Sequence, residues 1–161
     1  MIDITENYLR FEQGRVVLSI RRLDEESSVH RFPNYRQLRP ATTSSTVVME
    51  DRSDRVDKIL RTFERLGEKF GNNLPVVLDF CPDTKEAEAT LKLVDVGEHS
   101  AALPLQSCQG ASVHIAFNPK FLRAAVSFAG RNLEFTDALK PAVLRGSGEA
   151  RYALLMPVRL S

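Results

Sequence analysis

The chain has 161 residues, which is enough for one domain of ordinary size or for one domain and part of another. Hydrophobic residues make up 43% and charged residues 27%, a globular composition that can bury a core. The net charge of +1 favours neither a strongly basic nucleic-acid-binding protein nor an acidic tail, although a local basic face is compatible with it. The polar first residues are unlike a signal peptide and no apolar run is long enough to span a bilayer, so we expect a soluble cytoplasmic protein.

The first 41 residues are predicted to form a hairpin followed by an extended connector. Apolar residues on both sides of Gln13-Gly14, a turn signal, predict a hairpin over residues 8–23. Two prolines are expected to hold the backbone of residues 31–40 extended. Small polar residues follow this stretch, so we place a domain boundary near residue 41.

Two helices are predicted in the rest of the chain. The first follows a strand, with Asp51 or Ser53 as its cap, and the second begins at Asn118 and Pro119, which suit an N-cap and a first helical turn. Gly130 ends the second helix. Apolar residues at helical spacing define the expected buried faces, which are Val56, Ile59, Leu60, Phe63, Leu66 and Phe70 in the first helix and Phe121, Leu122, Ala125 and Val126 in the second.

Strands are predicted around both helices, so that the chain from residue 46 onward reads as two similar halves. The expected strands cover residues 46–49, 75–81, 88–94, 99–105, 112–117, 131–136, 141–145 and 151–157. Each half has the order strand, helix, strands. We therefore predict an α+β fold in which each half packs one helix on largely antiparallel sheets.

The last residues are unusually apolar for a chain terminus. Leu154, Leu155 and Met156 form a run that stops at Pro157. Terminal segments fray unless something holds them, so this run must be covered either by its own domain or by a partner. The residues alone leave both interpretations open, an ordinary buried edge strand or a binding surface.

Nothing in the sequence has the pattern of a catalytic or metal-binding site. His30, His99 and His114 are scattered, and His114 alternates with apolar residues as a strand histidine does. Cys81 and Cys108 are far apart without a Cys-x-x-Cys context, which indicates reduced thiols. A Gly-rich phosphate loop, metal-ligand spacing and a nucleophile elbow are all missing from the sequence. We therefore expect no enzymatic activity, no metal and no cofactor.

Five short segments occur in one order and at spacings typical of a single family. They are residues 31–36 (RFPNYR), 96–98 (VGE), 115–122 (IAFNPKFL), 135–139 (FTDAL) and 156–160 (MPVRL). Together they resemble the bacterial DNA polymerase III beta subunit, the sliding clamp, in which two three-domain subunits close head to tail around duplex DNA. The resemblance implies a DNA-clamp fold, with residues 42–161 as a complete third domain. It implies that residues 1–41 are the last strands of the second domain and the connector.

The resemblance also implies partners and sites. The third domain of a clamp contributes one wall of an apolar groove that receives short peptides from polymerases, the clamp loader and repair proteins. Carried over, the groove residues are Pro33, Gln37, Leu38, Leu139, Pro141, Leu154, Met156, Pro157, Val158 and Arg159. Clamp helices face the phosphates of double-stranded DNA without reading sequence, and the corresponding basic residues here are Arg55, Lys58, Arg65, Lys69, Lys120 and Arg123, with Arg131 in a similar position.

The leading hypothesis is a non-enzymatic clamp module of DNA replication or repair. The runner-up is a short clamp-like accessory protein that binds partner peptides or a full-length clamp and regulates it without encircling DNA. A small hydrolase that uses His114 is a third, remote reading. Because the strands in residues 1–41 lack partners, we also expect a homo-oligomer or association with a clamp.

Overall fold

The computed structural model describes residues 2–5, 8–21, 34–50, 54–71, 74–83, 86–93, 95–146 and 151–160. The chain forms two compact units, Met1–Asn34 and Tyr35–Ser161, and the domain boundary near residue 41 stays a prediction. Four residues named above, His30, Pro33, Asp51 and Ser53, lie outside the described residues. No helix in the described part of the chain is both long enough and apolar enough to cross a membrane.

The first unit contains a three-stranded antiparallel sheet in the order β1-β2-β3. Its strands are β1 (Ile2–Ile4), β2 (Tyr8–Gln13) and β3 (Val16–Arg21). The predicted hairpin is confirmed for β2 and β3, which pair from Tyr8↔Arg21 to Gln13↔Val16. Gly14 occupies the turn with φ of 60°, a left-handed conformation that glycine adopts without strain.

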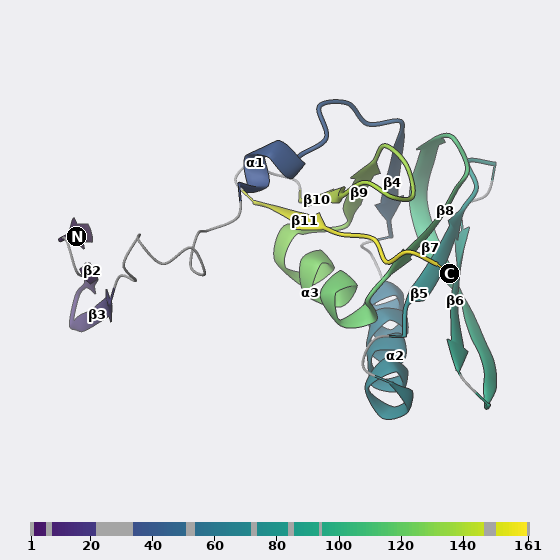
Figure 1. Ribbon diagram of the computed structural model, residues 1–161, viewed down its shortest axis with the longest axis horizontal. Coiled ribbons are helices and arrows are strands. Elements are labelled where there is room, and N and C mark those ends of the chain that lie inside the picture. Colours follow the sequence, from purple (N-terminus) through teal and green to yellow (C-terminus); the bar gives the residue numbers. More distant parts are fainter. Residues whose placement is uncertain are drawn as a thin grey trace. The chain divides into compact units, whose positions relative to one another are not determined.

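The second unit is built on one eight-stranded antiparallel sheet (Figure 1). Its strands are β4 (Ser45–Met49), β5 (Val76–Phe80), β6 (Glu86–Leu93), β7 (Gly97–Gly110), β8 (Val113–Phe117), β9 (Asn132–Phe135), β10 (Ala142–Arg145) and β11 (Tyr152–Leu155), in the sheet order β11-β10-β9-β4-β7-β6-β5-β8. The helices are α1 (Tyr35–Leu38), α2 (Arg55–Phe70) and α3 (Pro119–Ala129).

The two predicted halves are present and exchange their first strands. The first half is β4-α2-β5-β6-β7 and the second is β8-α3-β9-β10-β11. β4 pairs with β9 of the second half, and β8 pairs with β5 of the first, so each half completes the other's sheet. The α+β prediction with one long helix in each half is therefore confirmed.

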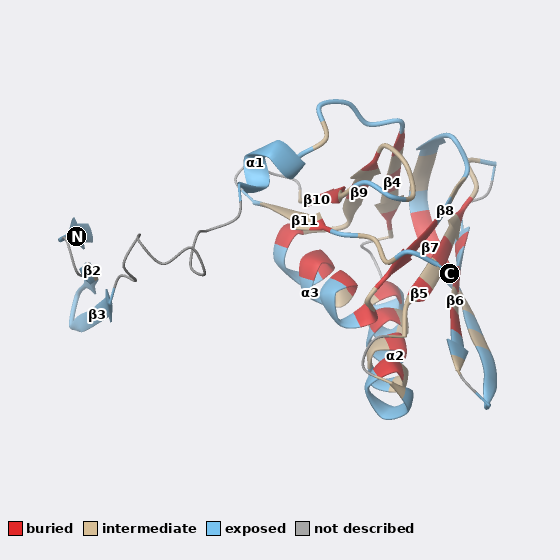
Figure 2. Cartoon of the chain, viewed as in Figure 1, coloured by how far each residue is buried: buried red, intermediate tan, exposed pale blue. Residues whose placement is uncertain are grey.

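The core lies between the sheet and the two long helices, α2 and α3, which also pack on each other. Figure 2 shows the buried stripes of both helices facing the buried strand positions. Val56, Leu60 and Phe63 are fully buried in α2. The prediction of a buried side chain is wrong for two residues, because Phe70 is 40% exposed and Phe121 is 61% exposed. Phe70 is the last residue of α2, and Phe121 lies just outside the stripe formed by Leu122, Ala125 and Val126.

The ends of α3 are those that the sequence predicts, whereas the start of α2 is not. The Asn118 side chain accepts hydrogen bonds from the backbone N–H of Lys120 (3.0 Å) and Phe121 (3.5 Å), so the predicted cap of α3 is confirmed. Gly130 ends α3 as expected. The predicted cap of α2 is wrong, because Asp54 holds the N-cap position and makes no side-chain capping bond.

The predicted extended connector is wrong for residues 35–38, which form the short helix α1. A proline restricts its own backbone and that of the residue before it. Tyr35 to Leu38 lie between Pro33 and Pro40 and include neither constrained position, so they remain free to form one helical turn.

Candidate peptide groove and basic helix face

The C-terminal segment leaves the sheet edge after β11 and reaches the opposite end of the sheet. β11 pairs with β10 through Ala142↔Leu155 and Val143↔Leu154. Beyond Leu155 the chain turns out of the sheet at Met156 and Pro157, and the backbone N–H of Val158 donates to the carbonyl oxygen of Ala116 in β8 (2.8 Å). This bond fixes the position of the segment.

The residues of β10 and β11 alternate between the core and the outer face of the sheet. Ala142, Leu144 and Leu155 belong to the core. Because side chains alternate along a strand, Val143 and its partner Leu154 point to the outer face. Val143 is only 1% exposed, so neighbouring groups cover it on that outer face.

The loop between β9 and β10 is shaped by one carboxylate. The Asp137 Oδ1 atom accepts hydrogen bonds from the backbone N–H of Leu139 (2.8 Å) and of Lys140 (2.9 Å), and the Lys140 ammonium lies 3.3 Å from Oδ2. The hydrogen bond from the Leu139 N–H is the largest cause that lowers the pKa of Asp137 below its usual value of 3.8; desolvation opposes it, and the Lys140 contacts lower the pKa further. The loop presents Leu139 with 63% of its surface exposed.

The connector is held beside β11 by an aromatic contact. The Arg39 guanidinium carbon lies 5.7 Å from the centre of the Tyr152 ring, a cation–π distance. α1 immediately precedes Arg39, and its Gln37 and Leu38 are exposed. Two groove residues expected from the sequence thus lie on a segment that is attached to β11.

We call the exposed or half-buried outer-face residues of this region the apolar wall. It consists of Leu139, Pro141, Leu154, Met156, Pro157 and Val158. All six were expected from the sequence, whereas Val143, the strand partner of Leu154 on the same face, was not. The signal for it was present, because three consecutive apolar residues in a strand, Ala142 to Leu144, require that both faces of the strand be covered.

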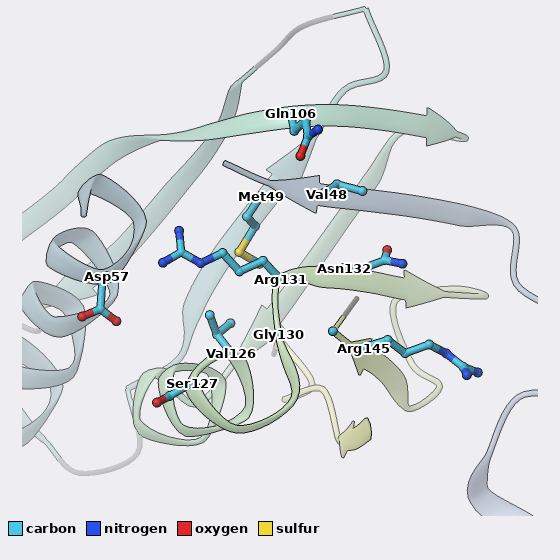
Figure 3. A pocket seen from close by; sticks show the side chains of 11 residues that line it. Val48, Met49, Asp57, Gln106, Val126, Ser127, Gly130, Arg131, Asn132 and Arg145 are labelled. Carbon is cyan, nitrogen blue, oxygen red and sulfur yellow. The ribbon is translucent and has the colours of Figure 1, made fainter. Parts of the chain in front are cut away.

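Two cavities lined by described residues of the second unit contain no residue of the apolar wall. One of about 680 Å³ opens where the end of α3 meets the sheet, and Figure 3 shows Arg131, Asn132 and Arg145 around it. Arg131 donates to the Glu50 carbonyl oxygen, and the Arg145 Nε atom lies 3.3 Å from the Glu134 carboxylate. The arginine side chains diverge in Figure 3, so they do not converge on one ligand.

The exposed surface of α2 carries a basic ridge. At about 100° per residue, Arg55, Lys58, Arg65 and Lys69 fall within roughly 80° of one another, opposite the buried stripe. The acidic residues lie to one side of this ridge, where Asp57 pairs with Arg61 (3.4 Å) and Glu64 pairs with Arg123 of α3. We call the four cations the α2 basic ridge.

The cations on α3 are less available than those of the α2 basic ridge. Lys120 is exposed, whereas Arg123 is engaged by Glu64 and its side chain is only 32% exposed. Lys120 and Arg123 line a cavity of about 530 Å³ together with Phe128 and Arg151. Phe128 is 60% exposed, so this face combines aromatic and basic groups.

His114 forms a cross-strand pair on an exposed surface. Its Nδ1 atom lies 2.5 Å from Asp79 Oδ1, and the two residues are direct partners in the β5–β8 pairing. Their side chains are 60% and 47% exposed, and neither residue lines the cavities described above. Among the described residues, no group of three His, Cys, Asp or Glu side chains is placed to hold a metal ion.

Comparison with known proteins identifies the fold. No model of a protein family matches the chain, and no curated protein sequence matches it. Solved structures do match over 99% of the chain: the DNA polymerase sliding clamp of Bacillus subtilis (23% identity, TM-score 0.79), the beta subunit from DNA polymerase of Streptococcus pyogenes (19%, 0.77) and the DnaN sliding clamp of Pseudomonas aeruginosa bound to griselimycin (18%, 0.75). The chain spans 41–42% of the length of these proteins. It has the fold of the bacterial DNA polymerase III beta sliding clamps.

Proposed function

We propose that this chain is a non-enzymatic clamp module of DNA replication or repair that presents the apolar wall to short clamp-binding peptides. The observation that carries the proposal is the set of uncovered apolar side chains held on the outer face of β10 and β11. Leu139 and Met156 are 63% and 55% exposed. The Asp137 turn and the Val158–Ala116 bond hold the flanking backbone in place.

The chemistry of the wall suits peptides with two apolar anchors. Leucine, proline and methionine form a deformable surface with few polar requirements. Burying two such anchors contributes about 3–6 kcal/mol before ordering costs, which supports micromolar affinity. The griselimycin bound by the clamps of Pseudomonas aeruginosa and Bartonella birtlesii is a peptide, so peptide binding is compatible with this fold.

A peptide titration tests the proposal. A fluorescent peptide with Gln-Leu and Leu-Phe anchors is titrated into the wild type, Met156→Ala and Val96→Ala, with polarisation as the readout. About half of the Met156 side chain is still exposed, so its loss removes about 1 kcal/mol of burial and weakens binding roughly fivefold. Val96 is a matched control, because it is 60% exposed in the turn between β6 and β7. Absence of wild-type binding, or equal binding by the wild type and Met156→Ala, refutes the assignment.

A second candidate function uses the same exposed apolar wall. In this alternative the chain is an accessory that binds partner peptides or a full-length clamp and regulates it, and Leu139 and Met156 offer the same apolar side chains to such partners. Retention on nicked circular DNA that is lost when the DNA is linearised indicates encirclement and refutes this alternative. Competition with a full-length clamp for the labelled peptide, without such retention, supports it.

A further inference from the structure

The cavity of about 530 Å³ beside α3 combines an aromatic ring with basic side chains. Lys120, Ala124 and Phe128 follow one another at intervals of four residues, so they lie in one row along the exposed side of the helix. Arg151 reaches the same cavity from the residue before β11, a strand that packs against α3 (Figure 1). Two segments that are distant in the sequence therefore meet at this site, which we call the α3 cavity.

The α3 cavity has an excess of positive charge. Glu64 is the one carboxylate among the described residues that line it, and Arg123 is its partner. Lys120 and Arg151 are exposed, and neither has a carboxylate partner among the described residues. Two cations therefore remain available to an anionic ligand.

Phe128 is the aromatic component of the α3 cavity. Its side chain is 60% exposed, and it is not part of the core that α3 forms through Leu122, Ala125 and Val126. Surfaces that bind single-stranded nucleic acids combine such rings, on which bases stack, with basic residues that contact the phosphates. The α3 cavity has both components within one set of lining residues.

We propose that the α3 cavity binds single-stranded DNA, with one base stacked on Phe128 and the flanking phosphates held by Lys120 and Arg151. An unpaired base has an open face for stacking, whereas neighbouring bases cover both faces of each base inside a duplex. The ring therefore favours a single strand over a duplex. No residue of the α3 cavity belongs to the apolar wall, so the site goes beyond the proposed peptide binding. Only the choice of DNA over RNA rests on the proposed function.

A tryptophan at position 128 reports base stacking directly. The chain contains no tryptophan, so Phe128→Trp introduces the only indole fluorophore. Phe121→Trp is a matched control, because Phe121 is 61% exposed on the same helix and does not line the α3 cavity. Titration with octathymidylate at low salt is expected to quench the fluorescence of Phe128→Trp and to leave that of Phe121→Trp nearly unchanged. Equal quenching of both variants, or quenching of neither, overturns the proposal.

Affinity measurements on the full chain separate the contribution of stacking from that of charge. Phe128→Leu keeps an apolar side chain without the ring, and is expected to weaken binding of labelled octathymidylate about fivefold or more while duplex affinity is unchanged. Arg151→Ala is expected to reduce the slope of log K against log salt by about 0.7, the contribution of one phosphate contact with a single strand. Arg145→Ala is the control for charge, because Arg145 pairs with Glu134 and does not line the α3 cavity.

Three results of these measurements would overturn the proposal. They are no binding of octathymidylate by the wild type at low salt, an equal loss of duplex affinity in Phe128→Leu, and equal slopes for Arg151→Ala and Arg145→Ala. Binding of octauridylate without binding of octathymidylate would overturn the assignment of DNA. Circular dichroism confirms that the variants are folded. The peptide titration of the apolar wall uses other residues, so its failure and the failure of this proposal are distinguishable.

Discussion

The α2 basic ridge leads to a quantitative prediction about DNA binding. If the helix faces the phosphates of duplex DNA, each cation of the ridge that contacts a phosphate releases counterions and adds to the salt dependence of binding. We expect Lys58→Ala to reduce this dependence. Lys58 is exposed at the centre of the ridge and does not contribute to the buried face of α2.

The magnitude follows from the number of cations on the ridge. Four phosphate contacts give a slope of log K against log salt of about −3.6, so affinity falls about 150-fold between 50 and 200 mM salt. With one contact removed, the slope becomes about −2.7 and the loss is about 40-fold. Polarisation of a labelled 30-base-pair duplex, measured at 50, 100 and 200 mM salt, gives both slopes.

The structure supplies a control among the other cations. Arg123 is paired with Glu64 and is mostly buried, so Arg123→Ala is expected to leave the slope close to that of the wild type. The slope of Lys58→Ala must therefore differ from both. Equal slopes for the wild type and Lys58→Ala, or an equal reduction by Arg123→Ala, would show that the α2 basic ridge is a solvated surface without a role in binding DNA.

Two further predictions concern the Asp137 turn and the end of α3. The pKa of Asp137 is lowered in the folded chain, so the carboxylate stabilises the turn fully above pH 3.8 and this stabilisation is lost as the pH falls through the lower, folded pKa. The amide chemical shift of Leu139 should therefore titrate with a midpoint below pH 3.8. A midpoint at or above pH 3.8 contradicts this prediction. Gly130→Ala should destabilise the fold by more than about 2 kcal/mol in urea unfolding, because a Cβ there lies 2.5 Å from the Gly146 Cα atom at a φ of 118°. Gly97→Ala at φ of 131° has no neighbour within 4 Å and should cost less; equal losses would remove the packing argument.

The helices were predictable where local signals determine them. Asn118, Pro119 and Gly130 fix both ends of α3 through capping and backbone chemistry that depend on adjacent residues. Phe121 was misassigned because a spacing pattern defines an apolar stripe only to within one neighbouring position, and tertiary packing decides which edge of the stripe is covered. The segment of α1 was predicted to be extended because it lies between two prolines. The prolines restrict the backbone only of themselves and of the residues before them, and these positions lie outside α1.

The candidate site was predictable in its residues but not in its arrangement. The sequence contains the apolar run ending at Pro157, yet only strand pairing reveals that Leu154 points away from the core, and only the structure shows that Met156 is 55% exposed. The separation of charges on α2 follows from helical geometry, because Glu64 and Lys58 lie about 120° apart at 100° per residue. The pairing of Glu64 with Arg123 of α3 was not predictable, because it depends on how the two helices pack.

The internal repeat explains why an apolar surface remains open at this place in the fold. In the first half, β7 changes its pairing partner from β6 to β4 at Pro104. The Pro104 carbonyl oxygen accepts a hydrogen bond from the Glu50 N–H (3.0 Å). Beyond Pro104 the strand stays paired with β4, and Leu105 is only 6% exposed. In the second half the equivalent crossing occurs at Pro157, where the chain passes from β10 toward β8.

After Pro157 the chain is joined to β8 by the Val158–Ala116 bond, but it is not paired along the strand as β7 is with β4. Met156 and Leu139 are consequently left exposed at a position where the other half of the domain is closed by its own strand. The apolar wall thus lies where the other half has the β7–β4 pairing, which supports our proposal that it receives an extended peptide.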